Sequence, residues 1–169
     1  MRLINTRKHL QAFLNGAGTD QCGRTILEIL SADDDFWERS HTFIQWLFPT
    51  GKRSINNITA PTAAPGIQAP YMEKALERFM DFLMAAEWQY SGNHNCKRIT
   101  RVLESLQMFG YGSLAAKLRV YLHREMLFHP SLKECNKYWH VNMQGGEPYA
   151  GTVNGAVQCR ASEDEQQKN

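Results

Sequence analysis

Apolar residues recur at helical spacing through most of the first 130 residues of the chain. The clearest stripe has apolar side chains at i, i+3, i+4, i+7, i+8 and i+11, a spacing that places them on one face of a helix. This stripe consists of Met72, Ala75, Leu76, Phe79, Met80 and Leu83. Alternation of apolar and polar residues, which is typical of strands, never extends beyond a few positions. The pattern therefore predicts an all-α fold, an irregular single-domain bundle of about six helices.

Caps and helix breakers bound the helices predicted in the first half of the chain. A helix over residues 6–15 is expected to end at Gly16, and a short buried helix over residues 24–30 follows it. Asp33 is a candidate N-cap for a longer helix. This helix is expected to continue to Pro49, because proline disfavours helical geometry in the residue before it.

Residues 50–70 are predicted to form a long loop. They contain Pro61, Pro65 and Pro70 and no apolar stripe. Loops of this length inside a compact domain are uncommon and are often functional or mobile. A structural alternative stays open, in which the segment is a crossover pinned by contacts of its prolines and alanines.

Two more helices are predicted in the second half, one from about residue 97 to residue 110 and one over residues 113–128. Helical periodicity fades after them. The chain is therefore divided into a helical domain over residues 1–130, an irregular C-terminal extension over residues 131–159 and a tail over residues 160–169. The tail is expected to be disordered, because its polar and charged residues have almost nothing to bury.

The composition fits an ordinary globular domain. Of the 169 residues, 43% are apolar, and a chain of this length can bury roughly two-thirds of its unfolded surface. The 19 Lys and Arg residues against 17 Asp and Glu residues give a net charge of +2, which neither favours nor excludes nucleic acid as a partner. No apolar stretch approaches the ~20 residues of a membrane span, and the N-terminus lacks the apolar core of a signal peptide. We therefore expect a soluble, cytoplasmic protein, with the nucleus as an alternative if the source is a eukaryote.

Few residues point to covalent or metal chemistry. The four cysteines form no C-x-x-C pair, so free thiols are expected. The chain has no phosphate-binding loop, dinucleotide fingerprint or nucleophile elbow, and no two of its six histidines have the i, i+4 spacing of helical metal ligands. We therefore expect no metal and no cofactor, and favour a protein that is not an enzyme.

Cys96 is the one candidate nucleophile. It precedes the predicted start of a helix at about Lys97, where the helix dipole and the adjacent positive charges would stabilise a thiolate, and His94 is close in sequence. The alternative is an incidental cysteine at a helix start.

Polar and aromatic residues gather in two places that suggest a ligand site. The first group, on the helix predicted after Asp33, contains Arg39, His41, Gln45 and Trp46. The second group, around a predicted helix start, contains Trp88, His94, Asn95, Arg98 and Arg101. Arginines three residues apart at a helix start are able to hold a carboxylate or phosphate, and the two tryptophans would line an apolar wall. In the structural alternative, the arginines pair with Glu73, Glu77 or Glu104 and the tryptophans belong to the core.

Two blocks of sequence resemble a known family. Residues 38–49 have the sequence E-R-S-H-T-F-I-Q-W-L-F-P, which resembles the hallmark S-H-D-Y-I-Q-W-L-F-P of the opioid growth factor receptor family, with Thr42-Phe43 in place of Asp-Tyr. Residues 94–110 resemble that family's block H-N-x-x-R-I-T-R-I-L-x-S-L and its following glycine. Weaker matches lie at Gly23-Arg24-Thr25, Ile29-Leu30, Ser54, Asn56 or Asn57, and Ala60-Pro61.

The resemblance covers roughly residues 13–122 and is nearer to compact microbial members than to the animal receptors. It implies an all-helical domain. For the animal members it also implies binding of an opioid pentapeptide of the enkephalin type by a protein of the nuclear envelope and the nucleus. Residue types and resemblance both direct attention to His41, Gln45, Trp46, His94, Asn95, Arg98 and Arg101.

The leading hypothesis is a non-enzymatic intracellular binding module. It would accept a small anionic or peptide-like ligand between the two motif helices, or bind a protein partner. A nucleic-acid or nucleotide binder is the alternative, with phosphate contacts from Lys97, Arg98, Arg101, Lys117, Arg119 and Arg124. An enzyme of unrecognised type is a third class, and the oligomeric state stays open.

Overall fold

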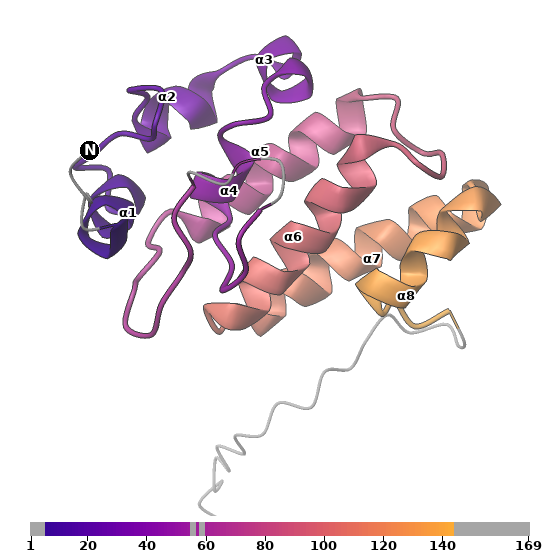
Figure 1. Ribbon diagram of the computed structural model, residues 1–169. Coiled ribbons are helices and arrows are strands. Elements are labelled where there is room, and N and C mark those ends of the chain that lie inside the picture. The colour runs from indigo at the N-terminus through magenta and orange to yellow at the C-terminus, as the bar shows by residue number, and fades with distance from the viewer. Residues whose placement is uncertain (1–5, 55–56, 58–59, 144–169) are drawn as a thin grey trace, which may run out of the picture.

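The computed structural model describes residues 6–54, 57 and 60–143. These residues form eight α-helices and one 3-10 helix, and their only extended pairing is an isolated bridge between Thr19 and Thr25. The predicted all-α fold is therefore confirmed (Figure 1). The predicted disordered tail, and the predicted extension from residue 144 onward, lie outside the described residues.

Three long helices form the frame of the molecule. They are α5 (Met72–Ala85), α6 (His94–Met108) and α7 (Gly112–Phe128). The apolar stripe predicted on residues 72–83 faces the core from α5, with Met80 partly buried and the other five residues fully buried. Helices α6 and α7 pack against each other and bury their own apolar residues in the same core (Figure 1).

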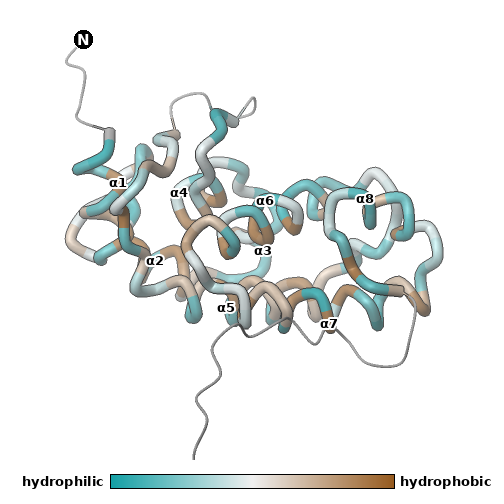
Figure 2. Tube along the Cα trace, turned by 90° about the horizontal axis from the view of Figure 1, so that it is seen from below, coloured by the Kyte–Doolittle hydropathy of each residue, from teal (hydrophilic) through white to brown (hydrophobic). Residues whose placement is uncertain are grey.

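Short helices pack on two sides of this frame (Figure 2). On one side lie α1 (Thr6–Leu14), α2 (Ile26–Ser31), α3 (Asp34–Arg39) and α4 (Ile44–Leu47). On the other side lie η1 (Pro130–Cys135) and α8 (Asn136–Trp139). Helices α2 and α3 pack on α5, while η1 packs on α7 and α8 packs on α6. Within the described residues, no helix has the length and apolar character needed to cross a membrane.

The prediction of a single helix ending at Pro49 is wrong, because the structure has two helices there. Helices α3 and α4 are separated by residues 40–43. In a continuous helix the carbonyl of Ser40 would accept a hydrogen bond from the N–H of Ile44. Here that carbonyl accepts a hydrogen bond from Arg98 of α6, at 2.7 Å. A distant side chain therefore replaces the helical bond at the break.

Two clusters of aromatic side chains fill the core. The first consists of Trp37, Phe43, Phe79 and Phe82, with ring centroids 4.8 to 6.4 Å apart. The second consists of Trp88, Tyr121 and Trp139, with Trp88 at 6.3 Å from each of the other two. Trp139 is fully buried and comes from the segment predicted to be an irregular extension. Its burial holds the described part of that segment against the frame.

Four arginines of the long helices cap the short helices. The carbonyls at the C-terminus of a helix lack partners within it, and a positive charge there also complements the helix dipole. The four donor–acceptor pairs are Arg78 to the Ala32 carbonyl after α2, Arg98 to the Ser40 carbonyl after α3, Arg101 to the Phe48 carbonyl after α4, and Arg119 to the Trp139 carbonyl of α8. These bonds dock the ends of α2, α3, α4 and α8 against the frame.

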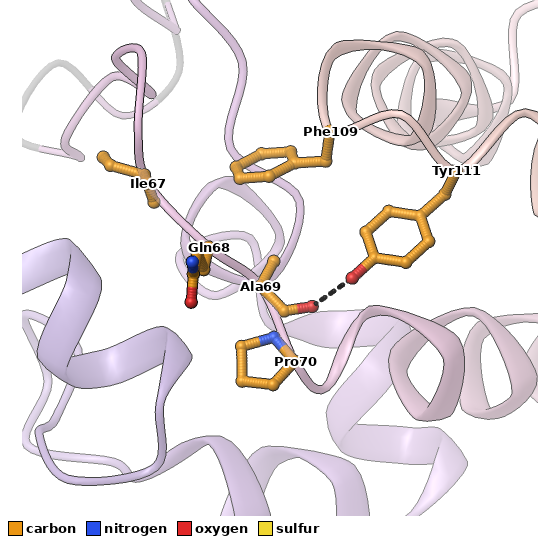
Figure 3. A pocket seen from close by; sticks show the side chains of 6 residues that line it. All are labelled: Ile67, Gln68, Ala69, Pro70, Phe109 and Tyr111. Carbon is orange, nitrogen blue, oxygen red and sulfur yellow. Dashed lines mark hydrogen bonds between the residues drawn. The ribbon is translucent and has the colours of Figure 1, made fainter.

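The long loop is tied down at several described positions. Gln11 of α1 donates to the carbonyl of Gln68 and accepts from its N–H, both at 2.9 Å. Tyr111 donates to the carbonyl of Ala69 at 3.0 Å (Figure 3). Residues 67–70, together with Phe109 and Tyr111, line a pocket of about 330 Å³ that has no charged side chain among its lining residues. In its described part, the segment matches the structural alternative of a pinned crossover.

Candidate functional site

The two sequence blocks meet where the C-terminus of α3 approaches the first turn of α6. Helix α6 begins at His94 rather than near Lys97, because the side chain of Asn93 caps it by accepting from the N–H of Asn95 at 2.8 Å. His94 and Asn95 therefore belong to the helix itself. On the other side, Glu38 is on α3 and His41 follows it.

Arg98 holds the two blocks together. Only 5% of the residue is exposed, and its guanidinium donates to the carbonyls of Trp37 and Ser40 and to Oδ1 of Asn95. Burial lowers the pKa of Arg98 to about 10, while the charge of Glu38 opposes this shift. The side chain stays protonated at neutral pH and keeps its donors turned toward the protein.

Arg101 points elsewhere, so the two arginines do not converge on one anion. Its Nη1 lies 3.4 Å from the Phe48 carbonyl and 3.4 Å from Oγ1 of Thr50, beyond the end of α4. Burial lowers its pKa, and the charge of Glu104 opposes that shift. Arg101 therefore donates to a backbone carbonyl and a hydroxyl, whereas the structural alternative expected a glutamate partner.

Polar side chains remain accessible above Arg98. Nε2 of His94 lies 3.3 Å from Oε1 of Glu38, and the two side chains are 39% and 43% exposed. The rings of His41 and His94 pack edge to face with centroids 5.3 Å apart. Glu38 also accepts from Nδ2 of buried Asn95 at 3.1 Å. We call Glu38, Arg39, His41 and His94 the motif surface; Arg39 is exposed and pairs with Asp35 of its own helix.

The His94 environment predicts a dependence of stability on pH. Partial burial lowers its pKa, the charge of Arg98 lowers it further, and Glu38 opposes both. The unfolded chain therefore takes up the proton first, so the free energy of unfolding should be highest above about pH 6.5 and fall below that. Urea unfolding between pH 5 and 7.5 measures this, and His94→Gln should flatten the slope. Equal slopes in the two proteins would contradict the assignment.

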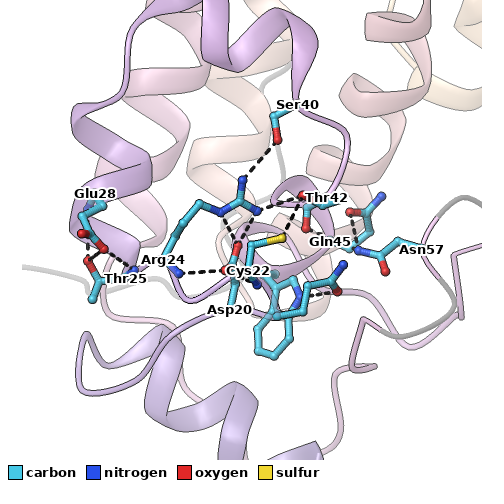
Figure 4. A network of polar contacts seen from close by, with 11 residues as sticks. Asp20, Cys22, Arg24, Thr25, Glu28, Ser40, Thr42, Gln45 and Asn57 are labelled. Atoms are coloured by element: carbon cyan, nitrogen blue, oxygen red, sulfur yellow. Dashed lines mark hydrogen bonds and ion pairs between the residues drawn. The ribbon is translucent and has the colours of Figure 1, made fainter.

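Gln45 and the two tryptophans of the predicted site lie away from the motif surface. Trp46 donates to Oε1 of Gln21 at 3.2 Å and packs against α1, and Trp88 belongs to the second aromatic cluster. They do not form the common apolar wall that we expected. Gln45 is buried and accepts from Nδ2 of Asn57 at 3.4 Å, which joins α4 to the long loop (Figure 4).

A buried ion pair between Asp20 and Arg24, beside these residues, was not predicted from the sequence. Asp20 has a fully buried side chain and pairs with Arg24, which also donates to Oγ of Ser40 and Oγ1 of Thr42 (Figure 4). Asp20 additionally accepts from the N–H groups of Cys22 and Arg24. The network thereby positions the segment between α3 and α4. The i, i+4 spacing of Asp20 and Arg24 was the available signal, but such spacing is common on exposed helices.

The structure does not show the activated Cys96–His94 pair of the nucleophile hypothesis. Burial, together with the neighbouring Cys135, raises the pKa of Cys96 to about 12 instead of lowering it. Its thiol donates toward the carbonyl of Tyr90 at 3.8 Å, while His94 faces Glu38. Within the described part of the chain, no three histidine, cysteine or acidic side chains are placed to share a metal ion.

The residues proposed as phosphate contacts of a nucleic-acid binder divide into an exposed group and a buried or partly buried group. Lys97, Lys117 and Arg124 are exposed, whereas Arg98 and Arg119 are buried and Arg101 is partly buried. The three arginines donate to protein carbonyls. They therefore contribute little to a surface that neutralises phosphates.

Known proteins that are similar to this chain carry the name of the family that the two sequence blocks resemble. The chain is similar to opioid growth factor receptor-like protein 1. It is 26% identical to the proteins of that name from Mus musculus and from Rattus norvegicus, over 166 residues. The match includes 79% of this chain and spans only 36% of the length of these curated relatives. No protein-family model matches the chain, and none of the solved structures gives a significant match.

This similarity supports a distant relationship to the opioid growth factor receptor-like proteins. It also agrees with the resemblance of residues 38–49 and 94–110 to that family. The contacts of Arg98 supply a physical reason for the two blocks, because that residue joins the end of α3 to the start of α6.

Proposed function

We propose that this protein is a non-enzymatic binding module of the opioid growth factor receptor-like kind, and that it binds a peptide-like ligand at the motif surface. The observation that carries the proposal is the partly exposed carboxylate of Glu38, which pairs with His94, whose ring packs on exposed His41 at the point where both sequence blocks meet. The similarity to opioid growth factor receptor-like protein 1 supports it.

The geometry favours a cationic or hydrogen-bonding group of a peptide over an anion. Arg98 and Arg101, the residues expected to hold an anion, donate to carbonyls of α3 and α4. The accessible groups are instead the Glu38 carboxylate, which accepts hydrogen bonds, and the two imidazoles, which donate or accept. A peptide amino group would pair with Glu38, and a peptide carbonyl would accept from the exposed His41.

Buried residues beneath the motif surface also hold its Glu38 side chain in place. Asn95 donates to Glu38 and accepts from Arg98, and both hydrogen bonds lie between buried or half-buried atoms. Side chains that are already ordered lose less conformational entropy when a ligand binds. This rigidity favours specific recognition of a small peptide.

Calorimetric titration with an enkephalin-type pentapeptide tests the proposal. Binding to the wild-type chain is expected, and acetylation of the peptide's amino group should weaken it. Glu38→Gln and His41→Ala should each weaken binding about tenfold, the effect of losing about 1.4 kcal/mol. Glu73→Gln, which removes an exposed carboxylate of α5, is the matched control and should leave binding unchanged.

Circular dichroism of each variant separates lost binding from lost folding. If the folded wild-type chain binds no pentapeptide, or if folded Glu38→Gln and His41→Ala bind as tightly as wild type, the motif surface is not the site of such a ligand.

A further inference from the structure

A second feature lies between α6 and the η1–α8 segment. It is a largely apolar, half-open cavity of about 330 Å³. Its lining residues are Gly92, Asn93, Cys96, Lys97, Thr100, Cys135 and Tyr138. Lys97 is exposed and is the one charged side chain among these lining residues. Two thiols from distant parts of the chain thus line one opening that has room for a small molecule.

The two thiols that line this cavity differ in accessibility. Cys96, in the first turn of α6, is 6% exposed, whereas Cys135 at the end of η1 is partly buried. Burial, and to a lesser extent the neighbouring Cys135, raises the pKa of Cys96 to about 12. Both side chains line the same cavity of about 330 Å³, which places the two thiols near each other. Both cysteines are free thiols in the structure.

We propose that Cys96 and Cys135 form a redox-active dithiol, which closes to a disulfide when a small anionic disulfide of the glutathione class enters this cavity. The proposal is independent of the motif surface. The cavity that both thiols line and the positive charge of Lys97 beside them carry it.

The reaction is two thiol–disulfide exchanges. The thiolate of Cys135, the more accessible cysteine, attacks one sulfur of the small disulfide, which forms a mixed disulfide and releases one small thiol. The sulfur of Cys96 then attacks the Cys135 sulfur, and its proton passes through solvent to the second small thiol as it leaves. Two protein thiols are oxidised and one small disulfide is reduced to two thiols. Lys97 attracts the carboxylates of the incoming disulfide.

The bond would join the first turn of α6 to the end of η1. It would then tether the segment that carries Trp139 to the frame, in addition to the hydrogen bond from Arg119 to the Trp139 carbonyl. Because a cross-link restricts the unfolded chain, we expect the oxidised protein to melt several degrees above the reduced protein.

The test uses a full-length Cys22→Ser/Cys159→Ser variant, which removes the exposed Cys22 and the cysteine outside the described residues. The folded variant is incubated with oxidised glutathione and analysed by mass spectrometry without reduction. We expect no free thiol, no retained glutathione and a peptide pair linked through Cys96 and Cys135. The wild-type chain should yield the same linked pair.

Adding Cys96→Ser to this variant gives the matched control. It should stop at one glutathione on Cys135, because no second thiol is present to displace it. The closing step in the parent variant should accelerate up to about tenfold for each pH unit between 7 and 9, since the attacking thiol is mostly protonated there. Retention of glutathione on Cys135 in the folded parent, or two free thiols after prolonged incubation, would overturn the proposal.

Discussion

Replacing Arg98 with alanine is expected to lower the free energy of unfolding by about 3 to 5 kcal/mol. The guanidinium donates to the carbonyls of Trp37 and Ser40 and to Asn95, and the residue is 95% buried. Alanine leaves these acceptors in a buried site without a partner, and each such group costs about 1 to 3 kcal/mol. The end of α3 also loses the positive charge that complements its dipole.

Urea unfolding of the two proteins at neutral pH measures this difference. Arg39→Ala is the matched control, because Arg39 is 79% exposed and pairs with the exposed Asp35. Its effect should stay within about 0.5 kcal/mol. Arg98→Lys retains the charge but lacks the planar fork that reaches several acceptors, so it should restore little of the loss. An Arg98→Ala protein as stable as Arg39→Ala would show that the buried contacts of Arg98 contribute no net stability.

Replacing Asp20 with alanine is expected to destabilise the fold by a similar amount, about 3 to 5 kcal/mol. The Asp20 side chain is fully buried, and it accepts from two backbone N–H groups as well as from Arg24. Alanine leaves the Arg24 guanidinium, of which only 22% of the side chain is exposed, without its negative partner. Removing one member of a buried ion pair is far more costly than removing one of an exposed pair.

Asp35→Ala provides a close control, since Asp35 and Arg39 have the same i, i+4 spacing on the surface. Thermal and urea unfolding should place Asp20→Ala well below Asp35→Ala in stability. The double variant Asp20→Ala/Arg24→Ala should be more stable than the sum of the two single changes predicts, because it leaves no unpaired charge. Equal effects of Asp20→Ala and Asp35→Ala would contradict the structural role of the network.

Several features of the fold were predictable because their signals are local. The stripe on residues 72–83 and the stop at Gly110 each depend on residues a few positions apart, and the structure shows α5 and the end of α6 at these places. Asp33 was also predicted correctly as a cap, since it accepts from the N–H of Phe36 at 2.8 Å. Helical periodicity and capping are properties of a short segment and need no knowledge of its neighbours.

The hydrogen-bond partners of Arg98 and Arg101 could not be predicted from local sequence. Arg98 and Arg101 are three residues apart on one helix, and this spacing suggested a common anion. In the structure they reach the ends of two different helices, more than 45 residues earlier in the chain. Their acceptors are backbone carbonyls, which every residue carries, so no side-chain pattern in the sequence marks them.

The sequence by itself determined the all-α class, the long helices and the two blocks that resemble the opioid growth factor receptor family, because these depend on residue order within short segments. Only the tertiary structure decided that α3 and α4 are separate helices, that Trp46 packs on α1 while Trp88 lies in the second aromatic cluster, and that Cys96 and Cys135 line one cavity. These features depend on which distant segments pack against one another. That packing sets the burial of each charged group or thiol, and burial decides whether the group can react with a ligand or must find its partners within the protein.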